Sequence, residues 1–117
     1  MTSAIPPTRP DEATTALSLE QFRALMLAAG YDEVIERRWA AGTVLDMHTH
    51  PFAANALVVQ GRMWLAVQGG AERVLTVGDT FHLGPEIPHA ERYCPAQGAT
   101  YWVARKDAPS SSPPSGL

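Results

Sequence analysis

The stretch that decides the fold is residues 42–61, "GTVLDMHTHPFAANALVVQG". It places His48 and His50 one residue apart, within a run of apolar and β-branched residues that is typical of a strand. Because side chains alternate across a strand, we expect both imidazoles on one face, with their Cβ atoms about 7 Å apart. Two imidazoles so placed can bind one metal ion, or they can simply hydrogen-bond at the rim of a core. The pair alone leaves both interpretations open.

The composition is that of one small globular domain of 117 residues, in which 45% of the residues are hydrophobic. The net charge is −3 and the basic residues are scattered, so we expect no nucleic-acid partner. No apolar run approaches the roughly 20 residues of a membrane helix, and no N-terminal signal segment is evident. The lone cysteine, Cys94, cannot form an internal disulfide, and a cytoplasmic location is the expectation.

Proline, serine and threonine concentrate at the two ends of the chain. Residues 1–16 and 107–117 are therefore predicted to be flexible tails around a folded unit at 17–106. One helix is predicted within "SLEQFRALMLAAG", residues 18–30. Ser18 and Gln21 have the spacing of a capping box, and Gly30 fits the end of the helix.

The rest of the folded unit is predicted to be all-β. Short strand-like runs alternate with turns rich in Gly and Pro, as in "MWLAV" and "ERVLTV" around "QGGA". This spacing favours an antiparallel sandwich or barrel. We expect seven or eight strands, within residues 32–39, 43–50, 56–60, 63–67, 72–77, 79–83, 89–94 and 99–106.

A second histidine motif follows at residues 78–89, "GDTFHLGPEIPH", in which His89 lies eleven residues after Gly78. In the first motif, Gly42 lies six residues before His48, and Gly61 eleven after His50. With both motifs in place, residues 36–105 resemble the cupin superfamily. Its first motif carries His-x-His and a Glu between two glycines, and its second opens with Gly-Asp and ends on a histidine.

The resemblance implies a small double-stranded β-helix, a jelly-roll-like cupin barrel, with one short N-terminal helix and a metal inside. Carried over by motif position, His48, His50 and His89 are the metal ligands. The Glu of the family falls on Ala54, or on Asn55 if the longer spacing is used, and neither is a carboxylate. The second motif also departs from the family, because Gly84-Pro85-Glu86 replaces its Pro-x-Gly.

The implied cofactor is one divalent transition metal. By softness, three imidazoles suit Zn, Cu, Ni or Fe better than Mg or Ca, and affinity alone does not choose among them; Mn is a further candidate. His82 is a candidate fourth ligand in place of the missing Glu, with a histidine packed at the rim of the barrel as the alternative.

Further candidates follow from alternation along the predicted strands. Glu91 and Tyr93 lie two and four residues after His89, so on a regular strand they share its face. With Tyr101, which the resemblance implies in the pocket, they are the catalytic candidates: Glu91 as a base or a partner of a ligand imidazole, the tyrosines as proton donors or simply as packing. The apolar pocket is predicted to include Asn55, Leu57 and Val59, with Trp64 and Val103.

Three functions remain open at this level, because the cupin fold does not fix function. The first is a small metalloenzyme, of oxygenase (dioxygenase-like), lyase or isomerase type, acting on a small organic molecule inside the barrel. The second is a non-catalytic module that binds or senses a metal or small ligand. The third is a structural cupin whose histidines bind nothing.

A 90-residue barrel has a poor ratio of core to surface, and a strand such as "VIERRW" (residues 34–39) invites pairing at its edge. We therefore expect a homodimer that forms along the N-terminal strand region. Light scattering should return about twice the chain mass of 12.6 kDa. A monomer mass at working concentration would contradict this expectation.

Overall fold

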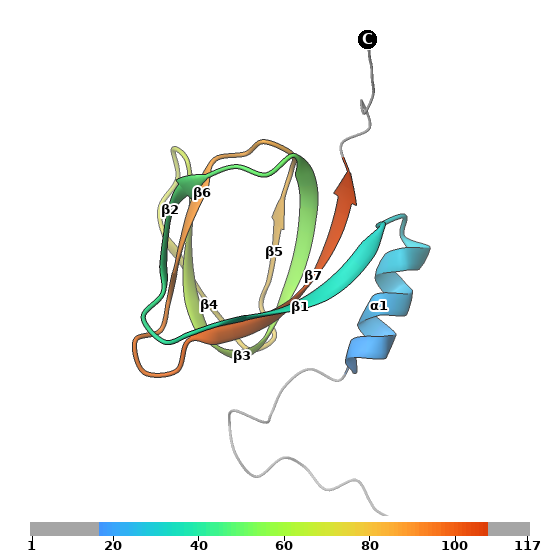
Figure 1. The fold of residues 1–117 in the computed structure, drawn as a ribbon, viewed down its shortest axis with the longest axis horizontal. Coiled ribbons are helices and arrows are strands. Elements are labelled where there is room, and N and C mark those ends of the chain that lie inside the picture. Colours follow the sequence, from blue (N-terminus) through green and yellow to red (C-terminus); the bar gives the residue numbers. More distant parts are fainter. Residues whose placement is uncertain (1–16, 108–117) are drawn as a thin grey trace, which may run out of the picture.

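The computed structural model describes residues 17–107, which form one helix and an antiparallel β-barrel (Figure 1). Helix α1 spans Leu19–Ala28. The strands are β1 (Glu33–Trp39), β2 (Val44–His48), β3 (Phe52–Val67), β4 (Arg73–Thr76), β5 (Thr80–Leu83), β6 (His89–Tyr93) and β7 (Ala99–Asp107). The predicted all-β fold with one short helix is confirmed.

Strand β3 holds the barrel together because it belongs to both of its walls. Its first part pairs with β5 and β7, and β7 pairs in turn with β1. Its second part pairs with β4 and β6, and β6 pairs with β2. We call β1, β7, β5 and the first part of β3 the front wall, and β2, β6, β4 and the second part of β3 the back wall. The sequence predicted two strands with a break at Gly61, whereas the structure has one strand of 16 residues that passes between the walls.

Gly61 lies where β3 leaves the front wall, with φ of +78°. A Cβ atom at this position would lie 2.2 Å from the Gly98 carbonyl oxygen, and a Cβ at Gly98 would lie 2.1 Å from the Trp39 carbonyl oxygen. Three backbone segments therefore meet at this corner at distances that only glycine permits.

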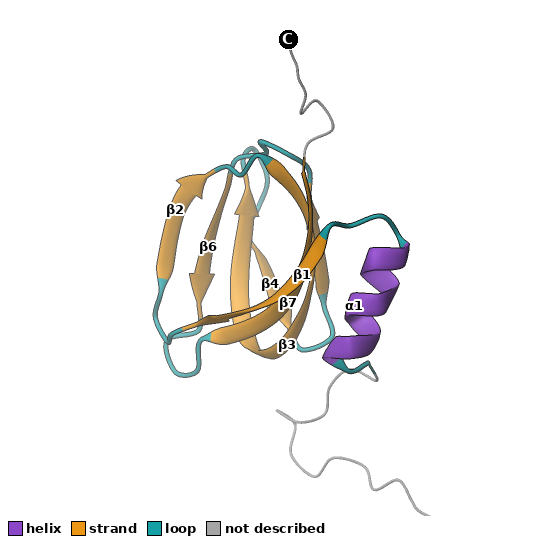
Figure 2. Cartoon of the chain, turned by 45° about the vertical axis from the view of Figure 1, so that its right-hand side comes forward, coloured by secondary structure: helices purple, strands orange, loops and turns teal. Residues whose placement is uncertain are grey.

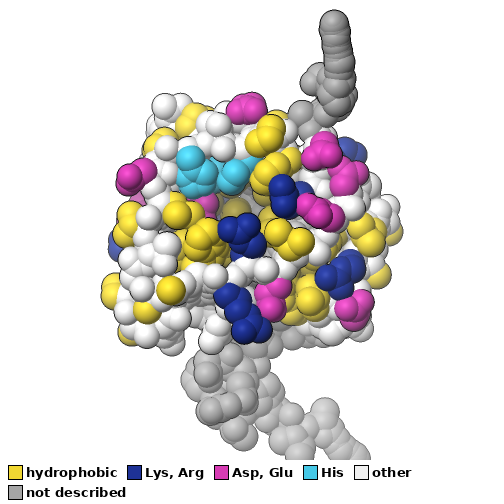
Figure 3. Space-filling view, viewed as in Figure 1, with side chains coloured by type: hydrophobic (Ala, Val, Ile, Leu, Met, Phe, Trp, Pro, Cys, Tyr) yellow, Lys and Arg dark blue, Asp and Glu magenta, His cyan; other side chains and the backbone are white. Residues whose placement is uncertain are grey.

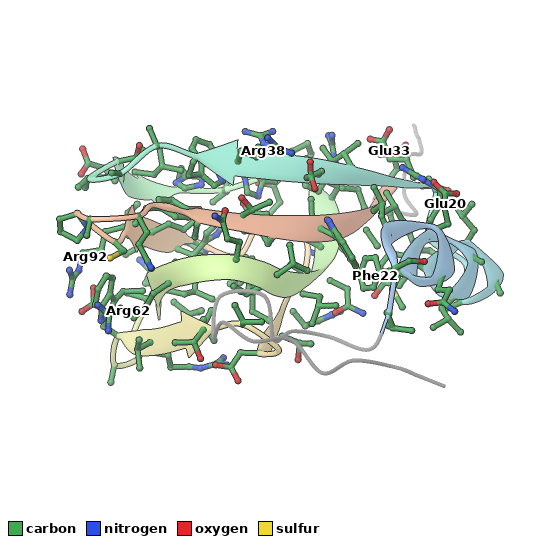
Figure 4. The ribbon with its side chains drawn as sticks, turned by 90° about the horizontal axis from the view of Figure 1, so that it is seen from below. Glu20, Phe22, Glu33, Arg38, Arg62 and Arg92 are labelled. Carbon is green, nitrogen blue, oxygen red and sulfur yellow. The ribbon has the colours of Figure 1, made fainter. Side chains whose placement is uncertain are left out.

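Helix α1 covers the outer face of the front wall (Figure 2). The Ser18 hydroxyl accepts from the Gln21 backbone N–H, and the Gln21 side chain accepts from the Ser18 N–H, so the predicted capping box is confirmed. Phe22 lies on the side of α1 that faces the strands (Figure 4) and packs 5.8 Å from the Trp102 ring. Leu25 of the same helix is 53% exposed.

The alternation of β3 separates the barrel interior from the surface beneath the helix. Ala54, Ala56 and Val58 point into the barrel core. Leu57 and Val59 point outward, into the cluster beneath α1, and the Asn55 amide contacts the Met26 sulfur at 3.6 Å. The prediction that Asn55, Leu57 and Val59 line the pocket is therefore wrong. Each lies one residue away from an inward-facing position, so its side chain is on the outer face of β3.

The predicted tails fall almost wholly on residues 1–16 and 108–117, which lie outside the described residues. Asp107, assigned to the second tail, is the last residue of β7, and its backbone N–H donates to the Asp32 carboxylate at 2.9 Å. Within residues 17–107, no helix combines the length and the hydropathy of a membrane span.

The corner at Gly61 can be tested against Gly42, which has the same φ of +78° but no atom within 4 Å of a built Cβ. Gly42→Ala should cost about 1–2 kcal/mol of unfolding free energy, from backbone strain alone. Gly61→Ala should cost more, because the new methyl group clashes with backbone. Thermal melts should show a clearly larger fall in Tm for Gly61→Ala, at roughly 4–8 °C per kcal/mol. Equal losses at the two sites would show that the contact with Gly98 is not limiting.

Candidate metal centre

A cavity of about 710 Å³ lies inside the barrel, between the two walls. A cavity of this size accommodates a small organic molecule. Residues of the front wall line it on one side: Ile35, Arg37, Trp39, Ala54, Phe81, Leu83, Tyr101, Val103 and Arg105. The other side is lined by Val44, Leu45, Asp46, Met47, His48, His89 and Glu91. Phe52, the first residue of β3, adds to the front wall, and His50 lies between β2 and β3.

Three of the four histidines meet in this cavity. His48 ends β2 and His89 begins β6, directly opposite each other in the antiparallel pair. Their ring centroids are 4.4 Å apart. His50 lies just after β2, in the turn that leads into β3, and its ring centroid is 5.0 Å from that of His48 and 4.9 Å from that of His89. The expected convergence is therefore present, although His50 reaches it from a turn rather than from the same strand as His48.

Backbone carbonyls fix the orientation of two of these imidazoles. His48 Nδ1 lies 2.6 Å from the Asp46 carbonyl oxygen, and His89 Nδ1 lies 2.8 Å from that of Ile87. A carbonyl can only accept, so Nδ1 of each ring must carry the hydrogen. In a neutral imidazole the lone pair is then on Nε2, and both Nε2 atoms face the cavity side where Glu91 lies.

The donor set fits a transition-metal ion. One ligand atom from each of His48, His50 and His89 can be chosen so that all three lie within 4.8 Å of one another. His89 Nε2 is buried and makes no hydrogen bond within the described part of the chain. A buried lone pair without a donor is costly unless a cation or proton meets it. A metal bound here would serve as a Lewis acid toward an oxygen-containing molecule in the cavity.

Glu91 brings a carboxylate to the same point. Its Oε2 atom lies 3.3 Å from His89 Nε2 and 3.5 Å from His48 Nε2. Its Oε1 atom accepts a hydrogen bond from the Tyr93 hydroxyl. Tyr93 is buried and stacks on Trp39 with ring centroids 5.2 Å apart. The hydrogen bond from this fixed ring therefore orients the Glu91 carboxylate.

These contacts shift the ionisation of the site. Burial raises the pKa of Glu91, but His89, the Tyr93 hydroxyl and His48 together lower this pKa by more, so the net shift is downward and Glu91 is ionised. Burial lowers the pKa of His89, but the Glu91 carboxylate and the Ile87 carbonyl raise it by more. Burial, with Tyr101 and Glu91, holds the pKa of Tyr93 far above its ordinary value, so Tyr93 remains a neutral donor.

His50 has the opposite tendency. Burial, together with the positive charges of His89 and His48, lowers the pKa of His50. Its ring stacks on Phe52, with centroids 4.7 Å apart and an angle of 11° between the planes. A neutral, immobilised imidazole is the form that binds a metal.

His82 does not join the centre. It is exposed on β5, whose inward residues are Phe81 and Leu83, and it pairs with the outward-facing Asn55. The prediction of His82 as a fourth ligand is therefore contradicted, because the strand alternation turns it away from the barrel. Of the two positions considered for the family's Glu, Ala54 lines the cavity and Asn55 does not.

The remaining candidates lie as follows. Tyr101 and Val103 line the cavity from β7, and Tyr93 lies behind Glu91. Trp64, expected in the pocket, lies outside it, with the Arg62 and Arg92 guanidinium groups over its ring. In Figure 4, Arg62 and Arg92 lie at the end of the barrel away from α1.

Two arginines in the cavity wall were missed from the sequence. The Arg37 guanidinium lies 4.7 Å from the centroid of the Trp39 ring, and the Arg105 guanidinium 4.1 Å from that of Phe52. Figure 3 shows Lys and Arg side chains beside the histidines and among hydrophobic side chains on one face of the molecule. Period-two alternation of Ile35, Arg37 and Trp39 was a signal that could have placed Arg37 inside.

Comparison with known proteins identifies the fold. No family model matches the chain, and no curated protein matches it. Among solved structures, an RmlC-like cupin from Shewanella frigidimarina matches with 24% identity and a TM-score of 0.55, over 68% of this chain and 70% of that one. KdgF from Halomonas sp. matches with 18% identity and a TM-score of 0.55, over 68% and 74% of the two chains.

A structure described under the DMSP lyases RdDddP and RnDddQII matches with 21% identity and a TM-score of 0.60, over 69% of this chain. This chain spans 41% of the length of that match and 36% of the DMSP lyase DddQ from Ruegeria pomeroyi. Together with the barrel and its histidine group, these similarities show that the chain has the cupin fold, as the sequence motifs predicted.

The histidine group predicts the behaviour of two sets of variants. Replacing His48 and His50 together with Ala should abolish uptake of one equivalent of Zn(II) or Co(II) at micromolar concentration, because two of three ligands are lost. His82→Ala should keep the metal, with affinity changed by less than about tenfold, or roughly 1.4 kcal/mol. Equilibrium dialysis with metal analysis measures both. Uptake of a full equivalent by the double variant would place the site elsewhere.

Proposed function

We propose that this protein is a metal-dependent cupin that binds a small organic anion in the barrel cavity and acts on it, as an oxygenase, lyase or isomerase. One observation carries the proposal: three imidazoles converge at one side of a 710 Å³ cavity whose other side presents two guanidinium groups. A metal held by His48, His50 and His89 and the cations of the front wall would both attract negative charge.

Arg37 is the wall residue best suited to recognise an anion. Arg37 lines the cavity and is also exposed to solvent, and no described carboxylate lies within ion-pair distance of its guanidinium. Arg105 is partly engaged, because one of its terminal nitrogens pairs with Glu33 at 3.1 Å, but its Nε is buried without a hydrogen-bond partner among residues 17–107. Guanidinium groups recognise carboxylates through paired N–H donors.

The apolar part of the wall would hold the rest of the molecule. Ile35, Phe81, Leu83 and Val103 give the cavity an aliphatic and aromatic surface. Tyr101 presents a buried hydroxyl whose pKa is raised by burial and by the Glu91 charge, so it would act as a neutral donor. These residues would orient the anion and exclude water from the metal side of the cavity.

The alternative function is a non-catalytic module that binds or senses a metal or small ligand. It uses the same site, so binding and turnover must be measured separately. The DMSP lyases and a variant oxalate decarboxylase from Bacillus subtilis among the structural matches are named for enzymatic activities. The latter is 19% identical over 69% of this chain, which supports a shared fold and leaves the activity of this chain as our proposal.

The test is an anion titration of the Co(II)-loaded protein, followed by visible absorption. Azide, acetate and oxalate should each perturb the spectrum, because the metal retains positions without a protein ligand. Arg37→Ala should weaken oxalate binding by about ten- to a hundredfold, the worth of one charge-assisted contact. Arg38→Ala is the matched control, because Arg38 is the next residue of β1 and is 3.2 Å from the Glu36 carboxylate.

Anions that bind are then incubated with the Zn(II) or Fe(II) form and their products followed by NMR. Turnover of a bound carboxylate supports the enzyme, and binding without turnover of any tested anion supports the binding module. A spectrum that none of the anions changes, with Co(II) bound, would refute an open metal centre.

A further inference from the structure

We propose that Glu91 is the carboxylate ligand of the metal centre, supplied by β6 in place of the glutamate that cupins carry on the first motif. This inference rests on the proposed metal centre. It assigns a position and a strand that the family pattern does not predict, because Ala54 occupies the usual glutamate position.

The distances are those of atoms that share a metal ion. Ligand atoms bound to one metal at about 2.1 Å lie about 3.0–3.4 Å apart when they are neighbours in octahedral or tetrahedral geometry. Glu91 Oε2 lies 3.3 Å from His89 Nε2 and 3.5 Å from His48 Nε2. Glu91 Oε2 therefore lies close to the distance of a neighbouring ligand atom from both imidazole nitrogens.

Hydrogen bonds engage the other polar side-chain atom of each of these three residues. The Asp46 and Ile87 carbonyls take the Nδ1 hydrogens of His48 and His89. Tyr93 donates to Glu91 Oε1 and leaves Oε2 without a donor. In the neutral tautomers, three acceptor atoms thus face one another with no hydrogen between them. Such a cluster is repulsive and requires a cation at its centre.

Two cations can fill this role, a metal ion or a proton. A proton would make His89 or His48 an imidazolium paired with Glu91. The third histidine favours the metal, because His50 adds another ring to the same group, with its centroid 4.9 Å from that of His89. A single proton satisfies two acceptors at most, whereas a metal ion can be shared by all four side chains.

The Glu91 carboxylate also makes the kind of hydrogen bond that metal-binding carboxylates make. Carboxylates that bind metals are commonly held by a hydrogen bond to the oxygen that does not bind. Tyr93 makes that bond, and its ring is clamped by stacking on Trp39. Tyr93 is thus a positioning residue. With Glu91 bound, the centre would carry a net charge of +1 rather than +2, still attractive to an anion.

The test compares Glu91→Gln with Glu72→Gln, a control on the outer surface, where Glu72 pairs with Arg92 at 2.7 Å. Co(II) affinity is measured by competition with a chromophoric chelator, and the visible bands of the bound Co(II) report its coordination. Glu91→Gln should lower the affinity by at least about a hundredfold and change the band positions and intensities. Glu72→Gln should change neither property.

A second pair of variants tests whether Glu91 binds the metal directly or only lies near it. Adding Ala54→Glu to Glu91→Gln supplies a carboxylate at the usual cupin position, in the opposite wall of the same cavity. It should regain at least about tenfold of the affinity. Tyr93→Phe keeps the carboxylate and loses only its hydrogen bond, so it should lose less than about tenfold and keep the wild-type band pattern.

The proposal is overturned if Glu91→Gln binds Co(II) within tenfold of the wild-type affinity and its visible bands are unchanged. A double variant that is folded but regains no Co(II) affinity also counts against the proposal. A crystal structure of the zinc-loaded wild type decides the question without any variant. Glu91 Oε2 about 2.2 Å or less from the zinc supports it, and Oε2 beyond about 3 Å refutes it. Failure of the wild type to bind metal is a different result, which refutes the proposed function itself.

Discussion

The position of every strand in this barrel depends on β3. It pairs directly with β4, β5, β6 and β7, and β1 and β2 attach through β7 and β6. A strand can serve both walls only if it turns sharply between them without losing its hydrogen bonds. The turn occurs at Gly61, where the Gly98 carbonyl approaches too closely for any side chain. The second glycine of the first motif is thus a geometric requirement of the barrel.

The side chains at the site are less favourable to bury than those of the apolar core. Around Glu91, oxygen and nitrogen lone pairs are brought together inside the barrel, and His89 Nε2 is left without a hydrogen bond. An apolar set of side chains would pack there at lower cost, as it does around Met63, Leu65 and Leu75. Residues that oppose folding in this way are expected where function requires them. The concentration of such residues at one point is the strongest structural indication that the cavity has a chemical role.

Much of this could be predicted from the sequence, for identifiable reasons. The helix was predicted from a local signal, the capping box of Ser18 and Gln21, and the barrel from turn spacing and paired motifs. The convergence of His48, His50 and His89 followed from the motifs. The inward and outward faces of β3 did not follow, because both faces are apolar: one meets the barrel core and the other meets α1. An apolar run with two buried faces carries no alternation, so Asn55, Leu57 and Val59 were assigned to the wrong side.

The remaining differences have similar causes. His82 could not be assigned a face across the loop that precedes His89, and the structure shows it outside. Alternation along the strand predicted Glu91 on the face of His89, but its proximity to His48 depends on the pairing of β2 with β6, which no local pattern specifies. Arg37 and Arg105 enter the cavity wall because β1 pairs with β7 along the whole of β1, with Arg37 opposite Tyr101.

The two walls of the barrel carry different chemistry. His48, His89 and Glu91 all belong to the back wall, whereas Arg37, Tyr101, Val103 and Arg105 belong to the front wall. Substitutions in the front wall can therefore reshape the space for a guest molecule while the ligand atoms keep their mutual distances. Such a division makes the barrel evolvable: substitutions in β1 and β7 can alter the cavity while β2 and β6 keep His48, His89 and Glu91 in place.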